Sequence, residues 1–183
     1  MHDELMKLIL FLILSPCLFA QSAVWVNYDQ NSFDSDTCCW RMLSRQGRFE
    51  ESAKLIVDFL HNGKVVNTQS LNWHAGQMFA FAGKNTQALR YFNKTYNVFQ
   101  KWFGGEDGKA WFYFAKGSSA FIKRNKLGLE KIIRYWKAKL PMDNNYRELV
   151  RLLENWSLPY EKAIKSAASD KSFGAIGMKP LFP

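Results

Sequence analysis

Apolar residues recur every three to four positions over most of the chain, which is the spacing of one face of an α-helix. In the stretch 49–60, this spacing puts Ala53, Ile56, Val57 and Leu60 on one face. The same pattern predicts seven or eight short helices, at 37–45, 49–60, 70–82, 86–101, 107–123, 127–140, 146–156 and 157–169. Glycines and Pro141 separate these segments, and nothing in the chain is rich in strand-forming residues. We therefore predict an all-α fold.

The predicted helices make up one domain, from residue 36 to residue 169. Residues 21–35 before it have no sustained period, and residues 170–183 after it are a tail in which prolines and glycines interrupt the apolar residues. The stretch 70–96 is the best-formed part of the domain. Its two helices meet at a turn around Gly83, and the small residues Gly76 and Ala88 favour close approach of the helices.

The first twenty residues have the order of a secretory signal peptide. An apolar run at 8–14 is followed by Ser15-Pro16 and by the small residue Ala20. The run is shorter than the roughly 20 residues that a membrane span needs. Since Asp3 and Glu4 cancel the positive charge usual in such a segment, a start at Met6 is an alternative. We expect an exported protein, periplasmic or secreted.

The helical pattern repeats along the chain. Placing Gly47 on Gly83 brings 42–48 onto 78–84, an offset of 36 residues, and placing Gly76 on Gly117 gives an offset of 41. The tetratricopeptide repeat has about 34 residues with small and aromatic residues at fixed positions. In 70–96, and less closely in 37–60 and 111–137, the chain resembles a degenerate member of this family. Either it is such a protein or it is an array of helical hairpins with the same packing.

The resemblance implies a right-handed array of antiparallel helix pairs, an α-solenoid, in which the first helix of each pair lines a concave face. Such a face would be basic at one end, aromatic at the other, and suited to an acidic or apolar peptide. Packing of the aromatic residues in the core is the alternative. The positions that the resemblance assigns to the groove are Arg41, Arg45, Trp73, Gln77, Phe81, Phe114 and Ser118, with Thr37 and Ile122.

Charge bears on the kind of partner. The formal net charge of +9 favours acidic partners or anionic surfaces, although it is also compatible with an ordinary basic exported protein. The segment 126–139 is basic and amphipathic, so it either lies on a membrane surface or presents a solvated basic face. Nucleic acid is not expected as a partner, because the chain has an export signal.

The aromatic residues around Gly104-Gly105 suggest a second function. Trp102 and Trp111 are candidate surface aromatics, because the six aromatic residues that flank this loop cannot all face one core. Exposed aromatic side chains of this kind can stack on sugars. A module that binds cell-wall glycan or the envelope surface is therefore the alternative to a protein or peptide partner.

Cys38 and Cys39 remain after Cys17 is removed with the signal peptide. They are small buried residues of a helix, a vicinal redox pair, or the ends of an intermolecular disulfide, which an exported protein can form. A helical backbone would oppose a bridge between adjacent cysteines.

Catalytic and metal-binding patterns are lacking. His61 and His74 are the histidines beyond the signal segment, and they have no partner at ligand spacing. The acidic residues at 29–36 lack the glycine and the final glutamate of a calcium loop. We expect no metal, no cofactor and no enzymatic activity. A small hydrolase that uses Glu106, Asp107 or Glu130 is a third hypothesis, although nothing in the sequence pairs these carboxylates.

Overall fold

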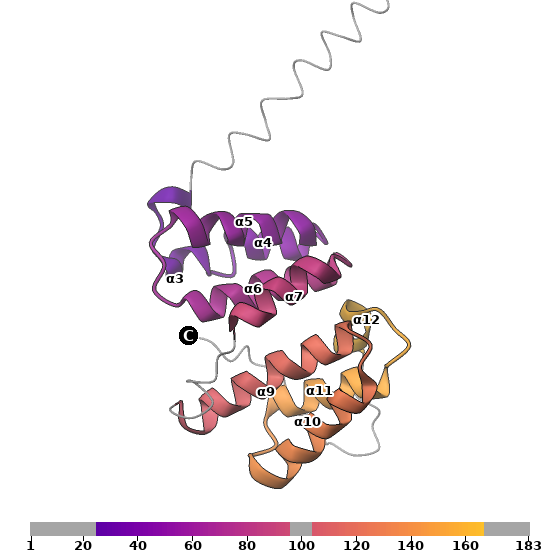
Figure 1. The fold of residues 1–183 in the computed structure, drawn as a ribbon. Coiled ribbons are helices and arrows are strands. Elements are labelled where there is room, and N and C mark those ends of the chain that lie inside the picture. Colours follow the sequence, from indigo (N-terminus) through magenta and orange to yellow (C-terminus); the bar gives the residue numbers. More distant parts are fainter. Residues whose placement is uncertain (1–24, 96–103, 167–183) are drawn as a thin grey trace, which may run out of the picture.

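The computed structural model describes residues 25–95 and 104–166, and these ranges are helical nearly throughout (Figure 1). They contain nine α-helices, preceded by the 3-10 helix η1 (Trp25–Asn27). The α-helices are α3 (Gln30–Phe33), α4 (Cys39–Arg45), α5 (Phe49–Asn62), α6 (Thr68–Phe81), α7 (Asn85–Thr95), α9 (Gly105–Ile122), α10 (Lys126–Lys139), α11 (Asn144–Glu154) and α12 (Tyr160–Lys165). The predictions for residues 1–20, for Trp102 and for residues 170–183 lie outside the described residues.

The predicted all-α fold is confirmed, and several helix ends differ from the prediction. The first predicted helix begins at Cys39 instead of Thr37, and the last begins at Tyr160, directly after Pro159. The aperiodic segment 21–35 contains α3, whose N-terminus is capped by Asp29 through a hydrogen bond from the Ser32 N–H.

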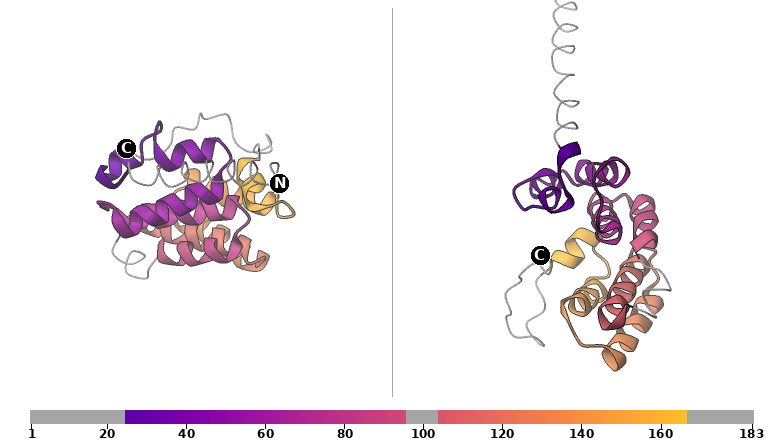
Figure 2. Two further views of the ribbon diagram at one scale, coloured as in Figure 1. Left: turned by 90° about the horizontal axis from the view of Figure 1, so that it is seen from above. Right: turned by 90° about the vertical axis from the view of Figure 1, so that its left-hand side faces the viewer.

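Helices that follow one another in the chain pack against one another, from α4 with α5 to α11 with α12. Figure 2 (right) shows that the helices follow a curve, with α12 on its inner side. There α12 contacts α6 as well as α11. The chain is therefore built from sequential helix pairs, and its last described helix packs back against an early one.

Three of the helix pairs turn in the same way. Gly47, Gly83 and Arg124 each have a left-handed backbone, with φ of 73°, 70° and 56°. In each turn the residue after the left-handed one donates its backbone N–H to the carbonyl five residues before it. The three pairs are Arg48–Leu43, Lys84–Phe79 and Asn125–Ala120, at 2.8–2.9 Å. This is the Schellman end of a helix. The spacing from Gly47 to Gly83 is 36 residues and that from Gly83 to Arg124 is 41 residues, which are the two repeat offsets found in the sequence.

Glycines in two helices allow close packing against large side chains. A Cβ at Gly76 would lie 2.5 Å from Cδ1 of Phe92, and a Cβ at Gly117 would lie 2.7 Å from Cδ2 of Leu149. Phe92 and Leu149 are fully buried. The α6–α7 and α9–α11 contacts therefore depend on the absence of a side chain at these two positions.

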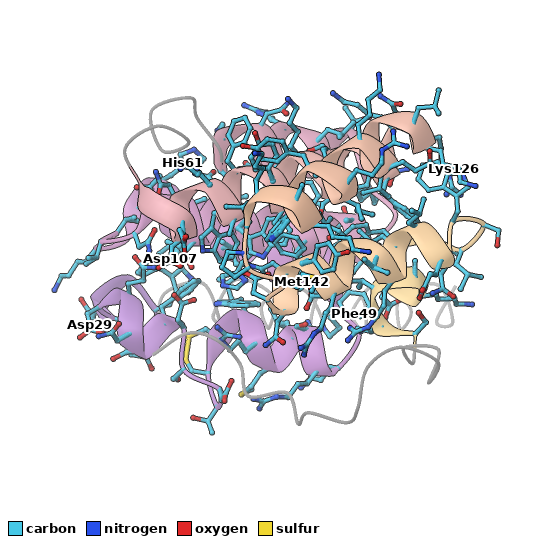
Figure 3. The ribbon with its side chains drawn as sticks, turned by 90° about the horizontal axis from the view of Figure 1, so that it is seen from below. Asp29, Phe49, His61, Asp107, Lys126 and Met142 are labelled. Atoms are coloured by element: carbon cyan, nitrogen blue, oxygen red, sulfur yellow. A yellow bond between two sulfur atoms is a disulfide. The ribbon has the colours of Figure 1, made fainter. Side chains whose placement is uncertain are left out.

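Cys38 and Cys39 form a vicinal disulfide (Figure 3, yellow bond). Cys38 is the extended residue before α4, and Cys39 has a φ of 54°. The bridge thus lies where the helix begins, so of the three alternatives the structure has the vicinal pair, and the two cysteines are not both inside the helix. None of the described helices combines the length and apolar character that a membrane crossing requires.

Candidate functional site

The aromatic residues expected in the groove lie mostly in the core. Trp73 and Phe114 are 3% and 2% exposed, and their ring centroids lie 4.5 Å apart. Trp73 also stacks on Phe92 at 4.8 Å. Trp111 is partly buried and packs edge-on against Trp73 at 5.7 Å. These residues therefore pack together within the core instead of facing an open surface.

Helix α12 occupies the inner face of the curve. Its Tyr160 is buried beside the rings of Phe81 and Phe121, at 6.0 and 5.9 Å. The Tyr160 hydroxyl donates to Oγ of Ser118 at 3.2 Å, and burial raises the pKa of Tyr160 above its usual range. Of the predicted groove residues, Phe81 and Ser118 thus lie against α12, while Gln77 is half-buried on the same helix as Phe81.

The last residue of α12 is held by two aromatic rings. Nζ of Lys165 lies 4.9 Å from the ring centroid of Phe49 and 4.8 Å from that of Phe81. It also forms an ion pair with Glu161 at 2.9 Å. Figure 3 shows Phe49 at the side of the molecule where α12 lies. The aromatic part of the inner face is therefore in contact with the chain's own C-terminal helix.

The two arginines expected in the groove are engaged by acidic residues nearby in the chain. Arg41 donates from Nε to the backbone oxygen of Asp34 at 2.7 Å. Asp36 lies 3.9 Å from Arg41 and 3.4 Å from Arg45. Their positive charge is therefore partly balanced within the chain.

Two hollows lie near the N-terminal helices. One, of about 590 Å³, is lined by Asp29, Asp34, Asp36 and His74 among others. The carboxylate of Asp34 already accepts hydrogen bonds from the Trp40 and Gln30 side chains. Within 25–95 and 104–166, no three His, Cys, Asp or Glu side chains are placed so that they could hold a metal ion. The other, of about 270 Å³, is lined in part by the disulfide.

A third hollow, of about 320 Å³, is lined by residues of both α9 and α10 and has a basic rim. Its basic side chains are Lys116 and Lys123 from the α9 side and Lys131 from α10. All three are exposed, and none forms an ion pair within the described ranges. The remaining residues of the lining are Ser119, Ala120, Asn125, Gly128 and Ile132.

The turn between α9 and α10 brings these lysines together. One face of the α9 segment carries Lys116, Ser119 and Lys123, because Ser119 lies three residues after Lys116 and Lys123 lies four residues after Ser119. The left-handed backbone at Arg124 ends that segment, and Asn125 caps α10 by accepting from the Gly128 N–H at 2.9 Å. The Arg124 side chain turns away, toward the Trp156 carbonyl and the Phe121 ring.

Positive charge is concentrated around this hollow. Residues 116–139 contain eight lysines and arginines and one acidic residue, Glu130. Figure 3 shows Lys126, at the start of α10, at the edge of the molecule among other nitrogen-tipped side chains. Sequence reasoning identified the basic character of 126–139 but not its convergence with Lys116 and Lys123. The face spacing on α9 is the signal that points to that convergence.

Comparisons with known proteins do not assign the chain to a family. No protein-family model, no curated protein and no solved structure matches it. The tetratricopeptide solenoid is accordingly not confirmed. The chain is an all-helical protein in which successive helices of the described residues pack in pairs.

Proposed function

We propose that this protein is an exported binding or scaffold protein built as a tetratricopeptide-like array of helix pairs, and that its partner is an acidic protein or peptide. The observation that carries the proposal is the set of three lysines around the α9–α10 hollow, which have no ion pair within the described residues. We call the surface formed by residues 116–139 the α9–α10 face. Unpaired charge of one sign on one face steers and orients a partner of the opposite sign.

The α9–α10 face supports binding better than the inner face does. The inner face is in contact with α12 through Tyr160 and Lys165, so a partner there would have to displace a packed helix. Arg41 and Arg45 are close to Asp36, whereas Lys116, Lys123 and Lys131 form no ion pair within the described residues, although Lys116 also lies over the Phe112 ring. The proposed site of binding is therefore shifted from the concave groove to the α9–α10 face.

The glycan alternative has less support. Trp111 is partly buried against Trp73 and Phe114, so its ring offers little free surface for stacking on a sugar. Trp102 lies outside the described residues. The exposed aromatic ring on the α9–α10 face is that of Tyr135, which is 41% exposed and packs at 4.6 Å against Tyr113.

Charge reversal on the full chain tests the proposal. The probe is a fluorescently labelled polyglutamate peptide, and its affinity is measured by anisotropy over a range of salt concentrations. The double variant Lys123→Glu/Lys131→Glu is expected to weaken binding by at least about tenfold, which corresponds to about 1.4 kcal/mol. Salt should weaken the wild-type binding, because exposed charges are screened.

The matched control is Arg90→Glu/Lys162→Glu. Both residues are exposed, they lie on α7 and α12, and their reversal changes the net charge by the same amount. Binding by this variant should stay within about twofold of wild type at moderate salt, because charges beyond a Debye length of about 10 Å are largely screened. Equal loss in the two double variants would show attraction to net charge alone and would overturn the proposal.

A further inference from the structure

We propose that the hollow between α9 and α10 is an oxyanion subsite for a tetrahedral anion, a phosphate or sulfate group. The inference deepens the proposed function and rests on it, since it names the chemical group of the partner that the α9–α10 face would bind. It is carried by the three lysines and by Ser119, a residue of the same lining whose hydroxyl is buried.

The side chains of the rim suit a tetrahedral anion. Lysine binds phosphate as a compact charge on a flexible stem, whereas the planar fork of arginine pairs in a bidentate way with carboxylate and phosphate alike. No arginine lines the hollow, and the neighbouring Arg124 is held by the Trp156 carbonyl and by the ring of Phe121. Lys116, Lys123 and Lys131 come from two sides of the hollow, so they can approach different oxygens of one anion.

Ser119 supplies the second, independent observation. It is 3% exposed, and its Oγ has no hydrogen-bond partner within the described residues. The preceding residue, Ser118, is fully buried as well, but its Oγ accepts from Tyr160. A buried hydroxyl without a partner is unfavourable, and such groups call for a functional explanation. An oxygen of a bound anion would accept the hydrogen bond that Ser119 can donate.

The cap of α10 adds a further donor. Because Oδ1 of Asn125 accepts from the Gly128 N–H, its Nδ2 amide is left to donate. A Cβ at Gly128 would lie 2.6 Å from that Nδ2 and would clash with it, so the cap needs a glycine at this position. The N-terminus of this 14-residue helix also carries a partial positive charge. Two uncharged donors and three ammonium groups therefore line one hollow of about 320 Å³.

Titration of the full chain with inorganic phosphate, inorganic sulfate and acetate, followed by isothermal calorimetry, tests the subsite. Phosphate and sulfate are expected to bind and acetate is not. Lys131→Gln should weaken phosphate binding by at least about tenfold and Ser119→Ala by about fivefold, because hydrogen bonds to charged groups are the strong ones. The control Ser44→Ala, on α4, should leave phosphate binding unchanged.

A stability measurement separates a binding role of Ser119 from a structural one, and a pH series compares phosphate with sulfate. Ser119→Ala should leave the free energy of unfolding equal to or higher than that of wild type, since it removes an unpaired hydroxyl. A phosphate ester carries its second charge above a pKa of about 6, so acidification should weaken binding of a phosphate group while sulfate is unaffected.

Each outcome decides between the proposals. Binding of polyglutamate without binding of either oxyanion overturns the subsite and leaves the proposed function standing. Binding of the oxyanions without polyglutamate overturns the proposed function and leaves the subsite. Oxyanion binding that is unchanged in Ser119→Ala and Lys131→Gln places the anion elsewhere and overturns the subsite.

Discussion

The hydroxyl of Tyr160 on α12 donates a hydrogen bond to Oγ of Ser118 on α9, across 42 positions of the sequence, at 3.2 Å. Both residues are buried. The bond joins the last described helix to the middle of the chain and satisfies two polar groups that water does not reach. It is the polar part of the contact by which α12 occupies the inner face.

Removing Tyr160 in two steps separates the hydrogen bond from the packing. Tyr160→Phe is expected to lower the free energy of unfolding by about 1 kcal/mol, because it leaves Ser118 without its partner. Tyr160→Ala should cost about 3 kcal/mol or more, because it also removes the ring beside Phe81, Phe92 and Phe121. Urea unfolding measures both changes.

The control for this pair is Lys162→Ala, an exposed position on the same helix. It should change the free energy of unfolding by less than about 0.5 kcal/mol. Equal effects of Tyr160→Phe and Tyr160→Ala would contradict the packing that the structure gives to the Tyr160 ring. Hydrogen exchange of α12 amides should accelerate in Tyr160→Ala more than exchange in α5, because α12 opens locally.

The sequence predicted the helical hairpins because their signals are local. Helix periodicity and the glycines at Gly47 and Gly83 identified two turns, and the offset of 41 residues from Gly83 leads to Arg124. Arg124 adopts the same left-handed backbone without being glycine, so residue type alone could not reveal that turn. Most helix boundaries agree within one or two residues, since capping and periodicity depend on neighbours in the chain.

The site was harder to predict because it depends on distance in space. The resemblance placed Trp73, Phe114 and Ser118 on an open face, but α12 has only six residues and no signal that says where it packs. The α9–α10 hollow combines Lys116 with Lys131 through the turn at Arg124. Periodicity predicts which face of each helix is apolar, but it does not predict which other helix packs against that face.

Gly76 should resist substitution because it lies against Phe92. Gly76→Ala is expected to lower the free energy of unfolding by about 1–3 kcal/mol, since its Cβ would lie 2.5 Å from the Phe92 ring and the helices would have to shift. Phe92→Leu removes ring atoms from the contact. The loss of unfolding free energy in the double variant should therefore be smaller than the sum of the losses in the two single variants. A double-mutant cycle by urea unfolding measures this coupling, and strict additivity would contradict the contact.

The vicinal disulfide predicts a pattern of alkylation. In the full chain denatured without reductant, iodoacetamide should modify Cys17 alone, and after reduction it should modify all three cysteines. Mass spectrometry distinguishes these states. Modification of Cys38 or Cys39 before reduction, or a dimer on a non-reducing gel that Cys17→Ser does not remove, would contradict the vicinal bridge.

Loss of that bridge should change stability little. The closed loop contains two residues, so the disulfide removes little entropy from the unfolded chain. The left-handed backbone at Cys39 also costs about 1 kcal/mol or more, which the unbridged chain can relieve. Cys38→Ser/Cys39→Ser is therefore expected to lie within about 1 kcal/mol of wild type in urea unfolding. A larger loss would show that the bridge holds the start of α4 in place.

The buried His74 and the partly buried Glu148 should make stability depend on pH in opposite directions. Burial, with a smaller effect of the Arg41 charge, lowers the pKa of His74 from 6.5 to about 3. Between these values the unfolded chain binds a proton that the folded chain does not, so this group reduces stability as pH falls. Burial raises the pKa of Glu148 from 4.5 to about 7. Here the folded chain binds the extra proton, so this group reduces stability as pH rises.

In the wild type the two effects partly cancel between about pH 5 and about pH 6.5, and single variants should reveal each of them. Glu148→Gln is expected to lose stability as pH falls through this window, because the effect of His74 is then no longer offset by protonation of Glu148. His74→Gln should gain stability as pH falls, because protonation of Glu148 favours the folded chain. Each slope can reach about 1.4 kcal/mol per pH unit.

Urea unfolding at a series of pH values measures these slopes, and the double variant His74→Gln/Glu148→Gln is the control, expected to be nearly flat in the same window. The sign of each slope is what the burial of the two groups determines, since desolvation disfavours the charged form of both an imidazole and a carboxyl group. If His74→Gln and Glu148→Gln sloped in the same direction, one of the two side chains would be hydrated in the folded protein. Comparison with the double variant would then identify which one.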